Sequence, residues 1–298
     1  MQRLDWARDG ADWPNRDCSR FVQAGAVRWH VQVAGDGPAL LLVHGTGAAT
    51  HSWRDLLPLL AKDFTVVAPD LPGHGFTSPG HGAASSLPGM AGGLAALLAA
   101  LDIAPVGAVG HSAGAAVVTR MALDGRLGSA QALVSLNGAL LPWRGVPGAM
   151  FAGTARLMSM APLVPTLFAR RAQDPRALER LLASTGSTLD ARGRTLYARL
   201  IRNPGHVAGA LALMARWDLR PLVAALPRLD TPLVLVVGER DGTVPPAEAD
   251  RVRTYLPAAR IVRQPGLGHL AHEEAPDRTA ALIREICAGT LAPDRGDC

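Results

Sequence analysis

Short apolar runs recur along the chain, and longer stretches with apolar residues at helical spacing separate them. Runs of this length are typical of central strands that are buried on both faces of a parallel sheet. Before them, the extended segment 19–35 turns at Ala24 and Gly25, which predicts a β-hairpin. The other predicted strands are residues 39–43, 65–68, 106–109, 132–136, 232–237 and 260–262.

Apolar residues at helical spacing predict helices between and after these strands. Strands that alternate with helices predict a doubly wound, mostly parallel sheet, which is an α/β fold. In such sheets, ligand sites lie at the carboxyl ends of the strands. The predicted helices are residues 52–62, 87–101, 115–123 and 276–287.

A long segment after the sixth predicted strand breaks this alternation. Residues 139–227 contain no convincing strand, are rich in Leu, Ala, Arg and Met, and are interrupted by Pro. We therefore expect a helical lid at 139–227, inserted between two parts of one core domain. The first part, with an N-terminal arm, is 1–138, and the second part is 228–298.

The composition narrows the classes of function. With 298 residues, 48% of them hydrophobic, the chain can bury a large core. Its net charge of +5 comes from arginines interspersed with acidic residues, which indicates a solvated surface and no nucleic-acid partner. No apolar run is long enough for a transmembrane segment, and no secretory leader is visible.

Cysteine and histidine usage bears on the compartment and on metal binding. Cys18, Cys287 and Cys298 are widely spaced and match no disulfide or zinc pattern, which favours a reducing, cytoplasmic location. The histidines form no spaced cluster with other ligand residues, so we expect no metal. No phosphate-binding glycine motif follows a strand, so we expect no cofactor.

The string GHSAG at residues 110–114 carries the strongest chemical signal, because it lies between a predicted strand and a predicted helix. Small residues two positions before and after Ser112 allow a sharp turn that exposes the hydroxyl at the edge of the sheet. This arrangement is typical of a nucleophilic serine. We therefore predict that Ser112 is the nucleophile.

A nucleophilic serine needs a base and an acid, which follow it along the chain in this arrangement. Asp241 comes shortly after the strand 232–237, and His269 lies in a loop after the last predicted strand, so we predict Asp241 as the acid and His269 as the base. The loop HGTG follows the strand 39–43. We expect its Thr46 and the residue after the serine, Ala113, to supply the backbone N–H groups of an oxyanion hole.

Several residues compete for these roles. Glu239 competes with Asp241, which we prefer because a glycine after it lets the chain turn away. Asn137 occupies the alternative position for the acid, but an amide cannot stabilise an imidazolium as a carboxylate does. His272 lies beside two glutamates near a helix start, so we expect it to be solvated. His206 lies in the lid, where we expect a solvated or packing role.

With these residues in place, the chain resembles the α/β-hydrolase superfamily from about residue 20 to residue 290. Five strings carry the resemblance in order: HGTG, DLPGHG, GHSAG, GERD and GLGH. One departure is Phe76-Thr77, where many members have serine. The resemblance implies an α/β-hydrolase fold with a helical lid, and hydrolysis through an acyl-enzyme on Ser112.

A closer resemblance is to the magnesium-chelatase accessory proteins that phototrophic bacteria encode with their bacteriochlorophyll biosynthesis genes. The strings DWPNR, RWHVQVAG, LLVHGTGAATHSWRDL, TGSTLD, MARWDL and GLGHLAHEE carry it across the arm, the core and the lid. It implies a role in photosynthesis, with a tetrapyrrole or its ester as the small-molecule substrate and magnesium chelatase as a partner. Three hypotheses follow: a serine hydrolase, a non-catalytic tetrapyrrole-binding or chelatase accessory protein on a hydrolase scaffold, and a C–C bond hydrolase.

The lid offers candidates for substrate binding, with ordinary helix packing as the alternative. A tetrapyrrole is a flat apolar ring with carboxylates at its edge, so apolar side chains can pack on the ring and arginines can pair with the carboxylates. We therefore expect the lid to select the substrate. The candidate residues are Met150, Phe151, Met158, Met214 and Trp217.

Overall fold

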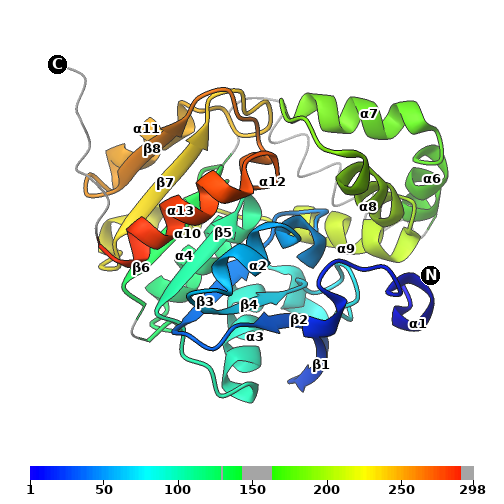
Figure 1. The fold of residues 1–298 in the computed structure, drawn as a ribbon, viewed down its shortest axis with the longest axis horizontal. Coiled ribbons are helices and arrows are strands. Elements are labelled where there is room, and N and C mark those ends of the chain that lie inside the picture. The colour runs from blue at the N-terminus through cyan, green and yellow to red at the C-terminus, as the bar shows by residue number, and fades with distance from the viewer. Residues whose placement is uncertain (129, 143–162, 290–298) are drawn as a thin grey trace.

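A mixed sheet of eight strands forms the centre of the protein. The computed structural model describes residues 1–128, 130–142 and 163–289. The strands follow the order β1-β2-β4-β3-β5-β6-β7-β8 across the sheet (Figure 1). β1 is antiparallel to β2 and β2 to β4, and all other neighbours are parallel. The strands are β1 (Ser19–Ala24), β2 (Val27–Ala34), β3 (Ala39–Val43), β4 (Thr65–Pro69), β5 (Gly107–His111), β6 (Ala132–Leu136), β7 (Leu233–Gly238) and β8 (Arg260–Gln264).

The predicted hairpin and the six predicted central strands are all present, so the α/β prediction is confirmed. The apolar runs are continuous because both faces of the sheet are covered. In β3, Leu41 belongs to the apolar cluster on one face, and Leu40 and Leu42 belong to the cluster on the other. All three are fully buried. Burial of such a side chain contributes about 1.5–3 kcal/mol relative to its exposed state.

Helices supply the other half of each apolar cluster. On one face, α3, α4, α10 and α11 contribute to the cluster that contains Leu41, and α2 and α13 contribute to the other cluster. The helices are α1 (Trp6–Asp9), α2 (Leu56–Leu60), α3 (Leu87–Ala100), α4 (Ala113–Leu123), α6 (Val164–Arg171), α7 (Pro175–Ser184), α8 (Ala191–Ile201), α9 (Pro204–Ala215), α10 (Arg220–Ala225), α11 (Glu248–Tyr255), α12 (Ala271–Glu274) and α13 (Pro276–Cys287).

The predicted continuous helix over 52–62 is wrong. A 3₁₀ turn, η2 (Thr50–Trp53), precedes the short helix α2 (Leu56–Leu60) instead. Pro58 has no N–H to donate to the carbonyl of Arg54, so the regular hydrogen-bond ladder cannot form there. That carbonyl accepts a hydrogen bond from Asn15 Nδ2 at 3.1 Å.

Helices α6 to α10 lie between β6 and β7 in the chain. Helices α6 to α9 lie beside one end of the sheet, whereas α10 lies near α4 over one of its faces (Figure 1). The loop after α7 contacts the second half of the core, since Thr185 O accepts the N–H groups of Gly242 at 3.2 Å and His269 at 2.9 Å. These contacts place the helical segment next to loops that follow β7 and β8.

The N-terminal arm packs on the same end of the sheet through two tryptophans. The ring centroids of Trp6 and Trp13 lie 4.8 and 5.0 Å from that of Phe76. Trp13 Nε1 also donates to Thr50 Oγ1 at 2.9 Å. Phe76, the departure from the family pattern, therefore provides the surface on which the arm rests.

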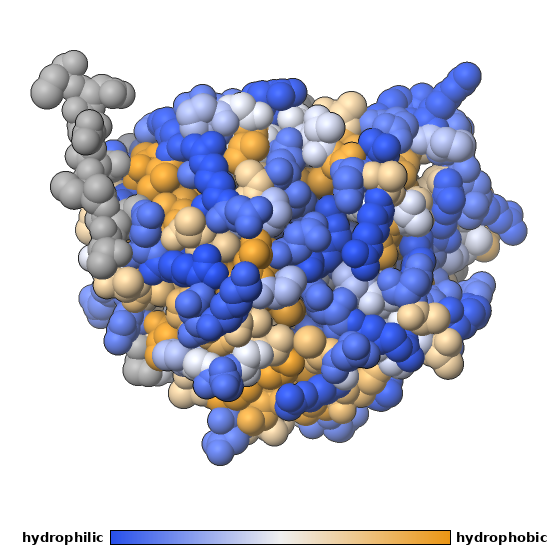
Figure 2. Space-filling model, in the orientation of Figure 1, coloured by the Kyte–Doolittle hydropathy of each residue, from blue (hydrophilic) through white to orange (hydrophobic). Residues whose placement is uncertain are grey.

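The visible face in Figure 2 is mostly hydrophilic, with smaller apolar areas between the polar side chains. This pattern agrees with arginines that are interspersed with acidic residues along the chain. Within the described ranges, no helix has the length and apolar character that crossing a membrane requires.

Candidate active site

Ser112 lies at the turn between β5 and α4, in a backbone conformation that L-residues rarely adopt. Its φ is 51° and its ψ is −117°. A side chain on Gly114 would overlap the carbonyl of Val43, and one on Gly110 would overlap the backbone of Ala115. The glycines therefore let β3, β5 and α4 approach closely enough to hold the serine in this strained turn.

Two backbone N–H groups near this turn have no acceptor among the residues that the structure describes. Ala113 is the first residue of α4, where helical N–H groups lack an intrahelical partner. Thr46 lies in the loop after β3, and the adjacent Gly45 packs against Ser112, because a Cβ on Gly45 would lie 2.8 Å from Ser112 Cβ. Neither N–H donates to any residue that the structure describes. Both donors are therefore free to bind a developing negative charge.

Asp241 and His269 form a buried pair at the ends of β7 and β8. His269 Nδ1 lies 2.7 Å from Asp241 Oδ2, and the side chains are 7% and 1% exposed. Asp241 Oδ1 accepts the backbone N–H groups of Thr243 at 2.7 Å and Val244 at 2.8 Å. These bonds fix the carboxylate, which in turn orients the imidazole and leaves Nε2 as its second reactive position.

Asn137 completes this arrangement. From the sequence, it was considered only as an amide in the alternative position for the acid. Its Nδ2 donates to Asp241 Oδ2 at 2.8 Å and to the carbonyl of Gly268 at 2.9 Å. Its Oδ1 accepts the N–H of Gly238 at 3.2 Å. The amide thus joins the ends of β6 and β7 to the loop that carries His269. The sequence did carry one signal for this role, because Asn137 directly follows the predicted central strand 132–136 and functional residues lie at the carboxyl ends of such strands.

The nucleophile and base candidates are linked through the residue before the serine. His111 Nε2 donates to the carbonyl of His269 at 2.9 Å, and their ring centroids lie 4.8 Å apart. Ser112 Oγ and His269 Nε2, both in described residues, are not hydrogen-bonded in this structure. Such bonds are often long without substrate. Glu239, the rival acid, is exposed, and Asp241 rather than Glu239 contacts the base.

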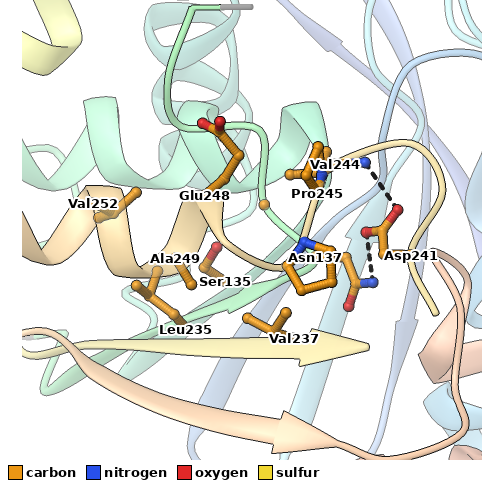
Figure 3. A pocket seen from close by; sticks show the side chains of 12 residues that line it. Ser135, Asn137, Leu235, Val237, Asp241, Val244, Pro245, Glu248, Ala249 and Val252 are labelled. Atoms are coloured by element: carbon orange, nitrogen blue, oxygen red, sulfur yellow. Dashed lines mark hydrogen bonds between the residues drawn. The ribbon is translucent and has the colours of Figure 1, made fainter. Parts of the chain in front are cut away.

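A small cavity lies behind the carboxylate of Asp241 (Figure 3). Its volume is about 20 Å³, room for roughly one water molecule. It is lined partly by Leu235 and Val237 and by Ser135, whose buried hydroxyl has no hydrogen-bond partner in the described part of the chain. The cavity is too small for an organic substrate and is therefore not the substrate pocket.

Comparison with known proteins supports the fold-level interpretation of this geometry. The family profile for the alpha/beta hydrolase fold matches residues 38–276, which include all the strands from β3 to β8 and most of the described helices. The chain belongs to the α/β-hydrolase fold family.

The relatives of this chain have names that refer to different functions. The chain is 38% identical over 281 residues to the magnesium-chelatase 30 kDa subunit of Rhodobacter capsulatus, covering 94% of this chain and 98% of the relative. It is 31% identical to the pimeloyl-[acyl-carrier protein] methyl ester esterase of Aromatoleum aromaticum, covering 85% and 99%. A solved α/β-hydrolase fold protein from Burkholderia ambifaria superposes with a TM-score of 0.75 at 24% identity, covering 90% and 97%.

The expectation that His272 is solvated is wrong for this α/β-hydrolase. The residue is 1% exposed, and its Nε2 lies 2.8 Å from Ser52 Oγ. Ser52 in turn donates to Glu273 Oε1 at 2.7 Å. The glutamates next to His272 do not make this helix start solvent-exposed, because the side chain of Glu273 is buried and forms an ion pair with Arg54.

The Arg54–Glu273 ion pair is buried, with side-chain exposures of 3% and 0%. Glu273 accepts hydrogen bonds from the guanidinium of Arg54, from Ser52 and from Tyr197, whose hydroxyl is 2.8 Å away. Burial raises the pKa of Glu273 despite these donors. Burial and the nearby carboxylate also raise the pKa of Tyr197 well above its ordinary value. The network ties η2 and α12 of the core to α8 of the helical insertion.

Of the nine histidines, His81 alone is exposed. Burial lowers the pKa of His206 to about 4 and that of His272 to about 3. Burial in this α/β-hydrolase therefore keeps these two imidazoles neutral at pH 7. The others with a pKa lowered by burial are His44, His51, His74 and His111.

The free energy of unfolding is expected to fall as the pH is lowered from 7 to 5. The unfolded chain binds a proton on each histidine near pH 6.5, whereas folded His206 binds one only near pH 4, so acid favours unfolding. One such group removes about 2 kcal/mol over this interval. Urea denaturation at pH 7, 6 and 5 measures the change.

His81→Gln is the matched control, because it makes the same substitution at an exposed position and removes no buried imidazole. His272→Gln should make the profile shallower. A free energy of unfolding that stays constant from pH 7 to 5 would contradict the neutral, buried state of these histidines.

The structure describes two of the five proposed substrate-binding residues. Met214 is half-buried on α9, and Trp217 packs partly buried against the main apolar cluster. Met150, Phe151 and Met158 lie outside the described residues. In the described part of this α/β-hydrolase, no three histidine, cysteine or acidic side chains gather as a metal site.

Proposed function

We propose that the protein is a serine hydrolase that cleaves an ester through an acyl-enzyme, with Ser112, His269 and Asp241 as its triad. The observation that carries the proposal is the buried His269–Asp241 pair at the strand ends where Ser112 occupies its strained turn. The free N–H groups of Thr46 and Ala113 near the same turn support it.

In the first half-reaction, Ser112 Oγ attacks the ester carbonyl and His269 Nε2 takes the hydroxyl proton. The carbonyl oxygen becomes an oxyanion, which the N–H groups of Thr46 and Ala113 bind. His269 then returns the proton to the leaving alcohol, and the acyl group stays on Ser112. Asp241 stabilises the imidazolium through Nδ1 during both transfers.

In the second half-reaction, a water molecule loses a proton to His269 Nε2 and attacks the acyl carbonyl. The same two N–H groups bind the second oxyanion. The proton returns to Ser112 Oγ as the carboxylic acid leaves, so the enzyme is restored and the ester is hydrolysed with one water molecule.

The substrate proposal rests on the relatives. The 38% identical relative is named a magnesium-chelatase subunit, and another is named a methyl ester esterase. We infer that the substrate is an ester in or near tetrapyrrole synthesis, and that the protein works in the cytoplasm. In this proposal, the segment 139–227 is the lid, and its apolar residues and arginines bind the ring and its carboxylates.

A second candidate function is a non-catalytic tetrapyrrole-binding protein that assists magnesium chelatase. The 98% coverage of the chelatase-named relative favours it. In this case the serine and the histidine would be retained without turnover. A protoporphyrin titration of Ser112→Ala protein detects the binding that both candidates require.

A fluorophosphonate is expected to label Ser112 covalently, because His269 removes the hydroxyl proton while the free N–H groups hold the phosphoryl oxygen. Mass spectrometry of digested protein locates the label. Ser112→Ala should remain unlabelled, and Ser135→Ala, which removes a buried hydroxyl behind Asp241, should be labelled normally. Folded wild type that takes no label yet binds protoporphyrin saturably would replace the hydrolase proposal with the second candidate.

A further inference from the structure

His206 reaches from the helical insertion into two loops of the core. It lies on α9 (Pro204–Ala215) and is only 2% exposed, so of the two expected roles the structure shows packing and not solvation. Its Nδ1 accepts the N–H of Gly75 at 3.0 Å, and its Nε2 donates to the carbonyl of Gly47 at 3.0 Å. These bonds require the neutral imidazole with its proton on Nε2.

The two loops are those that follow β3 and β4, and the first of them carries Thr46. Gly47 comes directly after Thr46, and the Nε2 bond holds the peptide between Gly47 and Ala48, which is two peptides beyond the one that carries the proposed oxyanion donor. Within this loop, Ala48 N–H donates to Gly45 O at 3.2 Å. Glycines on both sides of Thr46 make the loop conformationally free, and Gly47 has a φ of 75°. An outside contact is therefore needed to hold the loop in one conformation.

Other contacts fix α9 so that the imidazole cannot swing away. Asn203 Oδ1 accepts the N–H of His206 at 3.0 Å and caps the helix. A side chain on Gly209 would overlap the carbonyl of Gly73, so α9 lies directly on the loop after β4. Arg3 from the N-terminal arm donates to Gly205 O at 3.2 Å and to Thr77 O at 2.7 Å. Arm, insertion and core thus meet around His206.

We infer that His206 is a positioning residue that sets the oxyanion loop, so that the Thr46 N–H faces the carbonyl attacked by Ser112. The inference rests on the proposed hydrolase function. An oxyanion donor must lie about 2.7–3.1 Å from the oxygen it stabilises, so a small displacement of the loop weakens the transition state more than the bound substrate. His206 acts through Thr46 and does not touch the substrate.

His206→Asn and His206→Gln separate the two hydrogen bonds. The shorter Asn places an oxygen near the former Nδ1 and loses the bond to Gly47, whereas Gln can place an N–H near the former Nε2 and keep it. We expect His206→Asn to lower kcat for a simple aryl ester about 10- to 100-fold with KM little changed. His206→Gln should recover most of the loss. Titration with a fluorophosphonate gives the number of intact active sites, so that kcat can be calculated per intact site.

A purely structural role for His206 would lower the number of titrated sites and leave kcat per site unchanged. That result, or equal kcat values for the Asn and Gln variants, overturns the inference. If His206→Asn does not fold, Gly209→Ala replaces it, because a Cβ there pushes α9 from the loop after β4. Folded Gly209→Ala with wild-type kcat also overturns the inference. Wild type that takes no label at Ser112 overturns the proposed function instead.

Discussion

Replacing Asp241 with Asn is expected to lower ester turnover about 10⁴-fold, the loss seen when a serine-protease acid becomes its amide. Asp241 Oδ2 lies 2.7 Å from His269 Nδ1, and both side chains are buried, so the carboxylate is the charged partner of the imidazole. An amide can neither stabilise the imidazolium nor hold the required tautomer reliably. The ratio kcat/KM for an aryl ester, normalised by titrated sites, measures the loss.

Glu239→Gln is the matched control, since it makes the same chemical change two residues earlier. Glu239 is exposed and does not contact His269, so its variant should keep turnover within about twofold of the wild-type value. If the two variants had reversed effects, Glu239 would be the acid and the buried pair would be only structural.

Arg54→Met is expected to lower the free energy of unfolding by about 3–5 kcal/mol. Its partner Glu273 is fully buried, and removing the guanidinium leaves that carboxylate with only Ser52 and Tyr197 as side-chain donors. The loss is large because a buried charge without its counter-ion keeps the full cost of desolvation. Urea denaturation at pH 7 gives the difference.

The more exposed ion pair of Arg263 and Asp250 provides the control, since its side chains are 41% and 56% exposed. Arg263→Met should cost less than about 1 kcal/mol. The double variant Arg54→Met/Glu273→Met should be more stable than Arg54→Met alone, because it buries no unpaired charge. Equal losses for Arg54→Met and Arg263→Met would show that the buried pair contributes no more than a surface pair.

Local pattern was enough to predict the sheet. The apolar runs at 39–43 and 132–136 are observed as β3 and β6 with the predicted bounds, because a strand buried on both faces needs uninterrupted apolar residues. The turn at Ser112 was also predictable, since the adjacent glycines permit a close approach that few other residues allow. The helix over 52–62 was mispredicted because the apolar spacing favoured a continuous helix, whereas Pro58 interrupts its hydrogen-bond ladder.

The burial and the hydrogen-bond partners of individual polar side chains depend on residues that are distant in the sequence. His272 was expected in water because its sequence neighbours are glutamates, yet Arg54, far away along the chain, makes the buried position favourable by pairing with Glu273. Asn137 was interpreted as a missing acid, but the strand order β6-β7-β8 brings it to Asp241 and Gly268.

The order of the strands, the serine turn and the candidates for nucleophile, acid and base could thus be predicted from local patterns, because these features depend on residues close together in the chain. Only the tertiary structure distinguished the environments of Asp241 and Glu239 and placed His206 against the loop of Thr46. The physical reason is that hydrogen bonds act over about 3 Å. Which distant residues reach that separation depends on strand order and on how the helices pack over the strand ends.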